Sequence, residues 1–220
     1  MVGLALIEAL ESADKQATLF LNGLHSGVTD PFWIMMSDKI VWVPLYAIAV
    51  FFLFKHLGWK KALVVIASVL LAFLVCDQFS NLVKHAAGRL RPGYNADMVR
   101  GGLVLLEGRG GYYGFFSAHA ANTFATALCL IIGFRNSGDH TYNAFYKFAL
   151  LWAALVSASR IFVGKHFLGD VLVGTAVGIT VGYFTGMLAR YVIQRYIDKV
   201  PPTGLTFVFD KKVSISPSRS

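Results

Sequence analysis

Charged residues are scarce in this chain of 220 residues. Only 15% of the residues are charged, whereas 56% are hydrophobic and the mean hydropathy is +0.59. A soluble domain carries more charge and fewer apolar residues. Several apolar runs also approach the length that crosses a bilayer. The composition therefore excludes an ordinary soluble domain and predicts one integral membrane domain over residues 1–220.

Cysteines and metal-ligand patterns are also rare. The two cysteines, Cys76 and Cys129, lie inside apolar runs without metal-ligand spacing, so we expect buried, inert thiols. The six histidines form no His-Glu-x-x-His pattern, and few acidic residues accompany them. We therefore predict that the protein needs no metal ion and no other cofactor.

Lysine and arginine residues outnumber the acidic residues, which leaves a net charge of +8. Such an excess can indicate nucleic-acid binding, but the basic residues cluster at the ends of apolar runs, where they would meet lipid headgroups. The sequence contains no basic helix or aromatic platform for stacking bases. We expect the bilayer as the partner, with no nucleic acid and no obligate protein partner.

Five apolar segments predict an all-α bundle of transmembrane helices. They comprise residues 40–54, 62–76, 117–134, 146–163 and 168–192, with a turn at 58–61 between the first two. The first two segments are shorter than the roughly 20 residues that a spanning helix needs, so their helices should continue into the polar flanks. In the fifth segment, glycines recur at every fourth residue and predict close helix packing: Gly174, Gly178, Gly182 and Gly186.

Residues 1–30 are apolar but carry four charges within eight residues, namely Glu8, Glu11, Asp14 and Lys15. This density argues against both a cleavable signal peptide and a spanning helix. We predict an amphipathic helix in the membrane interface. The alternatives are a soluble partner-binding helix and a sixth span.

Two polar regions complete the predicted organisation. Residues 85–116 form a long, glycine-containing loop, expected outside the cytoplasm, which could guide substrate or close over a site. A headgroup-level loop without a role is the alternative. Residues 194–220 form a charged tail that we expect in the cytoplasm, with a loosely ordered end.

Residues 159–170 concentrate side chains capable of chemistry, in the order Ser-Arg-Ile-Phe-Val-Gly-Lys-His-Phe-Leu-Gly-Asp. His166 and Asp170 are four residues apart and would share one face of a helix. A carboxylate beside an imidazole fixes its tautomer and makes the other ring nitrogen a better nucleophile or base. Arg160 supplies a permanent positive fork suited to phosphate. The alternative is a boundary loop whose charges lie among headgroups.

Two further polar groups lie beside other apolar segments. Lys84 and Arg91 are seven residues apart after the second segment, and a proline follows Arg91 directly. The tetrapeptide Phe116-Ser117-Ala118-His119 opens the third segment. We assume that each segment crosses the membrane once. The end of the second segment, the start of the third and the connection between the fourth and the fifth then lie at the same membrane face. We therefore expect all three groups to form a single site.

In this order, the motifs Lys-x6-Arg-Pro, Ser-x-His and Ser-Arg-x5-His-x3-Asp resemble those of the type-2 phosphatidic acid phosphatase family. That family also includes soluble acid phosphatases and vanadium haloperoxidases. The first and third motifs match at every defining position, whereas Phe116 and Ala118 replace the proline and glycine of the second. Alanine keeps the backbone amide but narrows its conformational freedom. Neither replacement removes a reacting group, so we expect activity.

The resemblance implies a phosphatase that acts through a phosphohistidine. His166, held by Asp170, would attack phosphorus in line, and His119 would protonate the leaving oxygen. Water would later release the phosphate. The expected enzyme is a membrane lipid phosphatase, because the spanning segments argue against a haloperoxidase.

The same resemblance implies the residues that bind phosphate. Lys84, Arg91 and Arg160 would neutralise its oxygens, so that no metal ion is required. The backbone amides of Ser117 and Ala118 lie where a helix should begin and could bind an anion. Ser117 could equally be only the N-cap of that helix.

The expected substrate is a phosphorylated lipid of a bacterial envelope. Undecaprenyl diphosphate, phosphatidylglycerol phosphate, phosphatidic acid and the phosphates of lipid A remain open. A lipid phosphotransferase with the same intermediate and a catalytically inactive lipid carrier are the alternatives in other functional classes. The intact motif residues argue against the inactive carrier.

The distribution of charge predicts the side of the membrane on which the site lies. The face with the turns at 55–61 and 135–147 and the tail carries eleven basic and three acidic residues, and the opposite face carries nine of each. Because positive flanks stay in the cytoplasm, we expect the site on the periplasmic or outer face of the bacterial inner (plasma) membrane.

Overall fold

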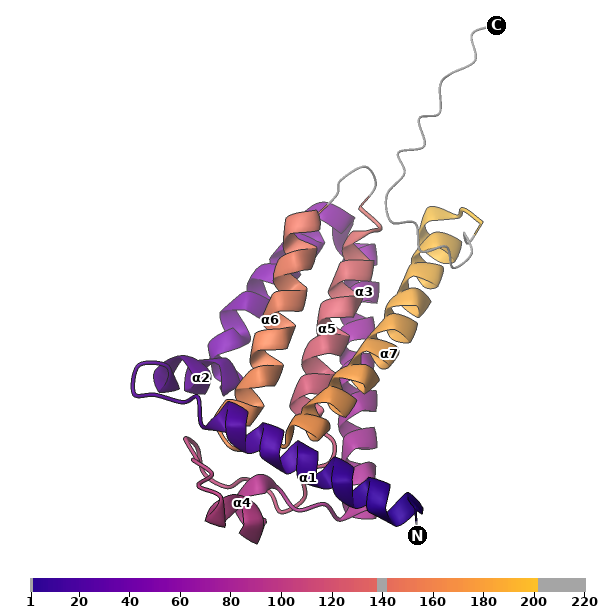
Figure 1. Ribbon diagram of the computed structural model, residues 1–220. Helices are drawn as coiled ribbons and strands as arrows, with labels where there is room; N and C mark the ends of the chain where they lie inside the picture. The colour runs from indigo at the N-terminus through magenta and orange to yellow at the C-terminus, as the bar shows by residue number, and fades with distance from the viewer. Residues whose placement is uncertain (1, 138–141, 202–220) are drawn as a thin grey trace, which may run out of the picture.

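Helices make up most of the computed structural model, which describes residues 2–137 and 142–201. Figure 1 shows them as a bundle crossed at one end by the N-terminal helix. The described residues contain no β-strand and only an isolated bridge between Leu90 and Tyr113. The α-helices are α1 (Val2–Asn22), α2 (Asp30–Ser37), α3 (Val43–Ala87), α4 (Ala96–Arg100), α5 (Ala118–Phe134), α6 (Asn143–Phe162) and α7 (Leu168–Val192). Short helical turns are η1 (Ile40–Trp42), η2 (Pro92–Tyr94) and η3 (Ile193–Asp198).

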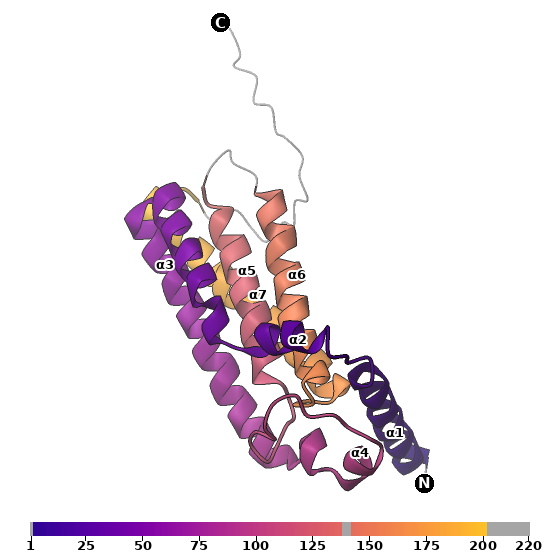
Figure 2. The same cartoon turned by 90° about the vertical axis from the view of Figure 1, so that its left-hand side faces the viewer.

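Helix α3 is bent into two arms at Gly58. This residue has φ 72° and ψ 163°, a conformation that glycine adopts most readily. The arms pack on each other, since Leu53 and Leu57 share a buried cluster with Ala62 and Val65. Figures 1 and 2 show them meeting at the end of the bundle opposite α1. The turn expected at 58–61 is therefore a bend at one glycine, because the three following residues are helical.

The bundle supplies the five expected spanning helices. Three stretches are long and apolar enough to cross a membrane, namely Ile40–Ala87, Asn143–Phe162 and Leu168–Asp198, and Ala118–Phe134 is a shorter apolar helix. Counting the two arms of α3 separately gives five. The first two spans extend into their polar flanks, as predicted. Two boundaries were wrong, because the loop begins at Gly88 rather than 85 and the last helical turn continues to Asp198.

Helix α5 is the centre of the bundle, and none of its residues is exposed. Helix α7 approaches it closely along the predicted glycine stripe. A Cβ atom added at Gly178 or Gly182 would lie less than 3.0 Å from the backbone of Ala121 or Ala125. The predicted packing role of these glycines is confirmed. Cys76 and Cys129 are buried free thiols, as expected.

Helix α1 lies across the end of the bundle at which α5 and α7 begin (Figure 1). Most of its apolar side chains point outward, and Leu6 and Leu10 are 59% and 63% exposed, whereas Leu21 packs against the bundle. This placement agrees with a helix in the membrane interface, which stays a prediction. Helix α4 and the loop from Gly88 lie at the same end (Figures 1 and 2).

Candidate active site

The three sequence motifs meet at the α1 end of the bundle. Helix α3 ends a few residues after Lys84, α5 begins at Ala118, and the turn between α6 and α7 carries His166. The backbone amide of Ser117 donates to the carbonyl oxygen of Asp170 at 2.9 Å, which joins the second motif to the third. A Cβ atom at Gly114 would lie 3.0 Å from both Arg91 and Asp170, so the first motif is adjacent as well. The expectation of one shared face is confirmed.

His166 is held in the tight turn after α6. The backbone amides of Lys165 and His166 both donate to the carbonyl oxygen of Arg160, at 2.9 and 3.1 Å. His166 Nδ1 lies 3.2 Å from Asp170 Oδ2, which also accepts from the amide of Phe167 at 3.1 Å. The expected pair is present, but His166 precedes α7 instead of sharing its helical face. Asp170 reaches back to it from the first turn.

Burial controls the charge of His166. His166 is 3% exposed and Asp170 is fully buried. Burial lowers the pKa of His166 to about 4, with Arg91 and Arg160 acting in the same direction and Asp170 opposing them. His166 is therefore neutral at pH 7. Because Nδ1 faces Asp170, Nε2 is the nitrogen left for a substrate.

The three predicted phosphate-binding cations come from different elements. Arg91 follows α3, and its Nε donates to the carbonyl oxygen of Tyr113 at 3.2 Å. Arg160, in the last turn of α6, is 9% exposed, and its Nε has no partner among the described residues. Lys84, in the last turn of α3, is partly buried and forms no ion pair within the described part of the chain. Two of the cations thus retain unused donors.

Ser117 and His119 lie at the start of α5. Ser117 is its N-cap, with the hydroxyl accepting from the amide of Ala120 at 3.4 Å. We expected the backbone amides of both Ser117 and Ala118 to bind an anion. The Ser117 amide already donates to Asp170, so only the Ala118 amide is left for this role. The carbonyl oxygen of His119 accepts from Thr123 Oγ1 at 2.7 Å, which fixes its backbone.

A cavity of about 350 Å³ extends from His119 between the two arms of α3 and α5. Its polar lining includes Lys39, Asn122 and Thr123 beside His119. The remainder is mostly apolar, and Leu70 and Phe73 at its rim are 65% and 48% exposed on the outside of the bundle. The cavity therefore opens sideways, toward the region that lipid would occupy.

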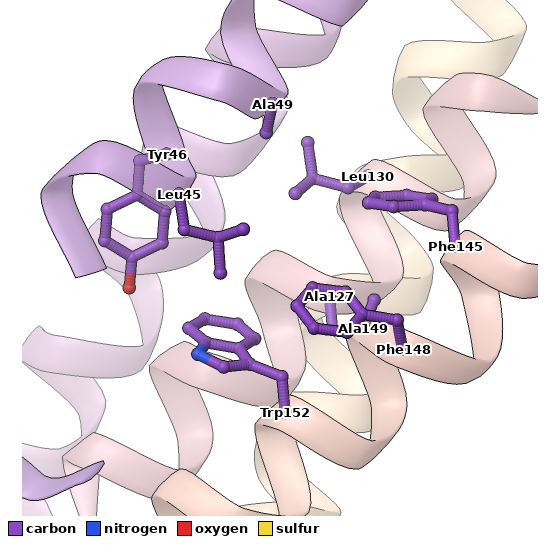
Figure 3. A pocket seen from close by; sticks show the side chains of 9 residues that line it. All are labelled: Leu45, Tyr46, Ala49, Ala127, Leu130, Phe145, Phe148, Ala149 and Trp152. Atoms are coloured by element: carbon purple, nitrogen blue, oxygen red, sulfur yellow. The ribbon is translucent and has the colours of Figure 1, made fainter. Parts of the chain in front are cut away.

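A second, much smaller pocket lies between the first arm of α3, α5 and α6 (Figure 3). Its lining is hydrophobic and includes Leu45, Phe148 and Trp152. It contains none of the motif residues, so it has no place in the chemistry of the site.

Comparison with known proteins places the chain in a family. The model of the PAP2 superfamily matches residues 61–194, which include all three motifs. The chain belongs to the PAP2 superfamily. A lipid A 4'-phosphatase from Bacteroides thetaiotaomicron is 34% identical over 201 residues, covering 90% of this chain and 87% of that protein. One from Porphyromonas gingivalis is 34% identical over 206 residues, covering 92% and 84%.

Two solved structures share the fold. A transmembrane PAP2-type phosphatidylglycerolphosphate phosphatase from Bacillus subtilis has a TM-score of 0.65 and 21% identity, covering 86% of this chain and 89% of that one. Aquifex aeolicus LpxE has a TM-score of 0.57 and 22% identity, covering 77% and 92%. Together with the family match, these similarities establish a multi-pass membrane protein and a phosphatase of the PAP2 superfamily.

Sequence reasoning missed one cation of this PAP2 site. Arg89 donates to Asp170 Oδ1 at 2.6 Å and to Asp14 Oδ2 of α1 at 2.5 Å, and its guanidinium lies 4.2 Å from the centre of the Phe167 ring. The sequence pattern places Arg89 in the loop of residues 85–116 and Asp14 among the charges of the interfacial segment 1–30. The available signal was Asp170 itself, because a carboxylate inside an apolar bundle requires a counter-ion.

Proposed function

We propose that this enzyme removes a phosphate from lipid A or a closely related phosphorylated lipid of the bacterial envelope. Its coarser function, that of a lipid phosphatase, follows from the family and its relatives. The finer assignment is supported by two lipid A 4'-phosphatases that match over most of their length. The cavity beside His119 supports a lipid substrate, since it would accept apolar chains next to the reacting group.

The observation that carries the mechanism is the buried pair of His166 and Asp170 facing the cations. In the first step, His166 Nε2 attacks phosphorus and the bond from phosphorus to the lipid oxygen breaks. Its electron pair stays on that oxygen, which takes a proton from His119. The products are a phosphohistidine and the dephosphorylated lipid.

In the second step, water attacks phosphorus while His119 takes its proton. The bond between phosphorus and nitrogen breaks, and its electron pair returns to His166. Lys84, Arg91 and Arg160 stabilise the negative charge on the oxygens of the transferred group in both steps. The position of His119 supports its role, because it lines the cavity and lies near both Arg160 and His166, where it would meet the oxygen that joins phosphate to lipid.

A substrate panel tests the proposal. Purified protein would be incubated with lipid A bisphosphate, undecaprenyl diphosphate, phosphatidylglycerol phosphate and phosphatidic acid, and phosphate release would be measured. We expect the highest kcat/KM with lipid A, and mass spectrometry would identify the position that loses phosphate. Preference for a glycerophospholipid would replace the proposed substrate. No release from any of the four by folded protein would reject the function.

We further propose that the site faces the periplasm or the outside of the bacterial inner membrane. The opposite end of the bundle carries Lys55, Lys60 and Lys61 around the bend of α3, as expected for the cytoplasmic side. A reporter fused after Ser220 tests this orientation in cells. Activity of a reporter that functions only outside the cytoplasm would reverse the topology and require a cytoplasmic substrate pool.

A further inference from the structure

One face of α1 is polar and lies against the catalytic end of the bundle. Asp14, Thr18 and Asn22 recur at every fourth residue on this face, and Thr18 and Asn22 are 0% and 1% exposed. Asp14 Oδ1 accepts from the amide of Gly169 at 2.8 Å, and Thr18 Oγ1 accepts from that of Leu168 at 2.9 Å. These amides belong to the first turn of α7 and lack partners within that helix. Helix α1 thus caps the helix that carries Asp170.

A continuous chain of charged groups runs from α1 to the reacting histidine. The second oxygen of Asp14 binds Arg89, and the other end of the same guanidinium binds Asp170 Oδ1. The remaining oxygen of Asp170 faces His166 Nδ1. Each carboxylate therefore uses one oxygen for Arg89. The other oxygen of Asp14 binds the first turn of α7, and that of Asp170 binds the turn between α6 and α7.

We propose that Asp14 and Arg89 are positioning residues for the reaction at His166. Asp14 holds Arg89 in place, and Arg89 orients Asp170 so that one carboxylate oxygen meets the imidazole. This inference rests on the proposed role of His166 as nucleophile. Neither Asp14 nor Arg89 touches the phosphate; both act through Asp170.

Charge gives Arg89 a second effect on His166. The charged groups that face the imidazole are Arg91 after α3, His119 of α5, Arg160 of α6 and Asp170 of α7, with Arg89 behind Asp170. By neutralising Asp170, Arg89 weakens the attraction of that carboxylate for a proton on His166. Removal of the Arg89 charge should therefore raise the pKa of His166 and leave less of the neutral nucleophile at mildly acidic pH.

Kinetics of single and double variants test the proposal on purified full-length protein. Asp14→Asn should lower kcat by about tenfold, the range found for outer-shell partners, with little change in KM. Arg89→Gln should lower kcat further and move the acidic limb of the pH profile to higher pH. Arg89→Lys keeps the charge and should leave that limb in place. The double variant should be no worse than Arg89→Gln alone, because Asp14→Asn keeps an oxygen that can accept from Gly169 and loses only the charge that holds Arg89.

Thr18→Val is the matched control for simple docking of α1. It removes a hydrogen bond to the neighbouring amide of α7 but leaves Arg89 untouched. The change in kcat caused by Thr18→Val should add to that caused by Arg89→Gln. The pH profile of Thr18→Val should match that of the wild type. The proposal would be overturned if all variants had the same pH profile. It would also be overturned if the losses of kcat in Asp14→Asn and Arg89→Gln added up in the double variant.

His166→Ala separates this inference from the proposed function. If His166→Ala is fully active, the phosphohistidine mechanism fails and the inference fails with it. If His166→Ala is inactive while Asp14→Asn and Arg89→Gln match the wild type, only the positioning role is wrong. Melting temperatures measured in parallel distinguish lost positioning from lost folding, and the conservative Arg89→Lys variant keeps the test decisive if Arg89→Gln does not fold.

Discussion

Ser37 at the end of α2 binds Arg160 through both its hydroxyl and its backbone carbonyl, across 123 residues of sequence. Both bonds come from the same terminal nitrogen of the guanidinium. The adjacent stacking of Trp33 on Phe162, with ring centres 3.9 Å apart, fixes α2 against α6. Arg160 is thereby oriented from outside the motif that contains it.

Ser37→Ala should weaken phosphate binding, because it removes one of the two acceptors that hold Arg160. We expect the inhibition constant for vanadate to rise about threefold to tenfold, the effect of losing one hydrogen bond of ordinary net strength. Inhibition assays measure this change. Ser12→Ala, at an exposed position of α1, is the control and should match the wild type. Equal vanadate inhibition in both variants would contradict the role of Ser37.

His166→Ala should abolish turnover, whereas Asp170→Asn should leave a small residual activity. The nucleophile is indispensable, while its partner orients it and typically contributes about 10⁴-fold in comparable triads. Trapping of radiolabelled phosphate on the protein would detect the covalent intermediate and should fail only in the His166 variant. Wild-type rates in that variant would reject the assignment. Because Asp170 also pairs with Arg89, Asp170→Asn should additionally lower the melting temperature.

The pH profile should be bell-shaped, with its acidic limb well below that of a free imidazole. The pKa of His166 is lowered to about 4, so the neutral nucleophile persists until the pH falls to that region. The alkaline limb should appear in kcat, because the negative charge of the bound phosphate would hold a proton on His119 until the pH rises. Measurement of kcat and kcat/KM against pH, with His119→Ala as the comparison, tests both limbs. A monotonic profile would contradict the paired roles.

Stability should depend on the same histidine. In the unfolded chain His166 takes up a proton below about pH 6.5, whereas the folded protein keeps it neutral down to about pH 4. The free energy of unfolding should therefore decrease as the pH falls from 6.5 to 4. His166→Ala should reduce this part of the decrease. Melting temperatures across this range provide the measurement.

Activity should survive an excess of EDTA, and vanadate should inhibit competitively. Three cations already supply the charge that a magnesium ion often supplies in phosphoryl transfer, and vanadate imitates the transition state. Phosphate release with and without chelator tests the first expectation. Loss of activity on chelation, restored by magnesium or zinc, would overturn the metal-free mechanism.

Gly178→Leu should lower both stability and activity. The leucine side chain would collide with the backbone of Ala121 and push α7 away from α5. We expect a melting temperature several degrees lower, as for overpacking that costs about 1–3 kcal/mol. Ala176→Leu, on an exposed side of the same helix, is the matched control and should change neither quantity. A Gly178→Leu variant with the melting temperature and activity of the wild type would contradict the packing role.

The apolar pattern predicted the spans and the shared face of the motifs, because hydrophobic length and the order of crossings are properties of the chain itself. The contact between His166 and Asp170 was predicted from spacing, although the turn that makes it was not. The roles of Asp14, Arg89 and Ser37 were not predictable in this way. Each depends on a contact between distant segments, and polar or charged residues of this kind are most often exposed to solvent.

The sideways opening of the cavity beside His119 affects the direction of the reaction. The dephosphorylated lipid would leave between the arms of α3 into the bilayer, while inorganic phosphate would leave into water. The two products then occupy different phases and rarely meet again at the site. Release into separate phases would make hydrolysis effectively one-way, even without a large free-energy difference in the chemical step.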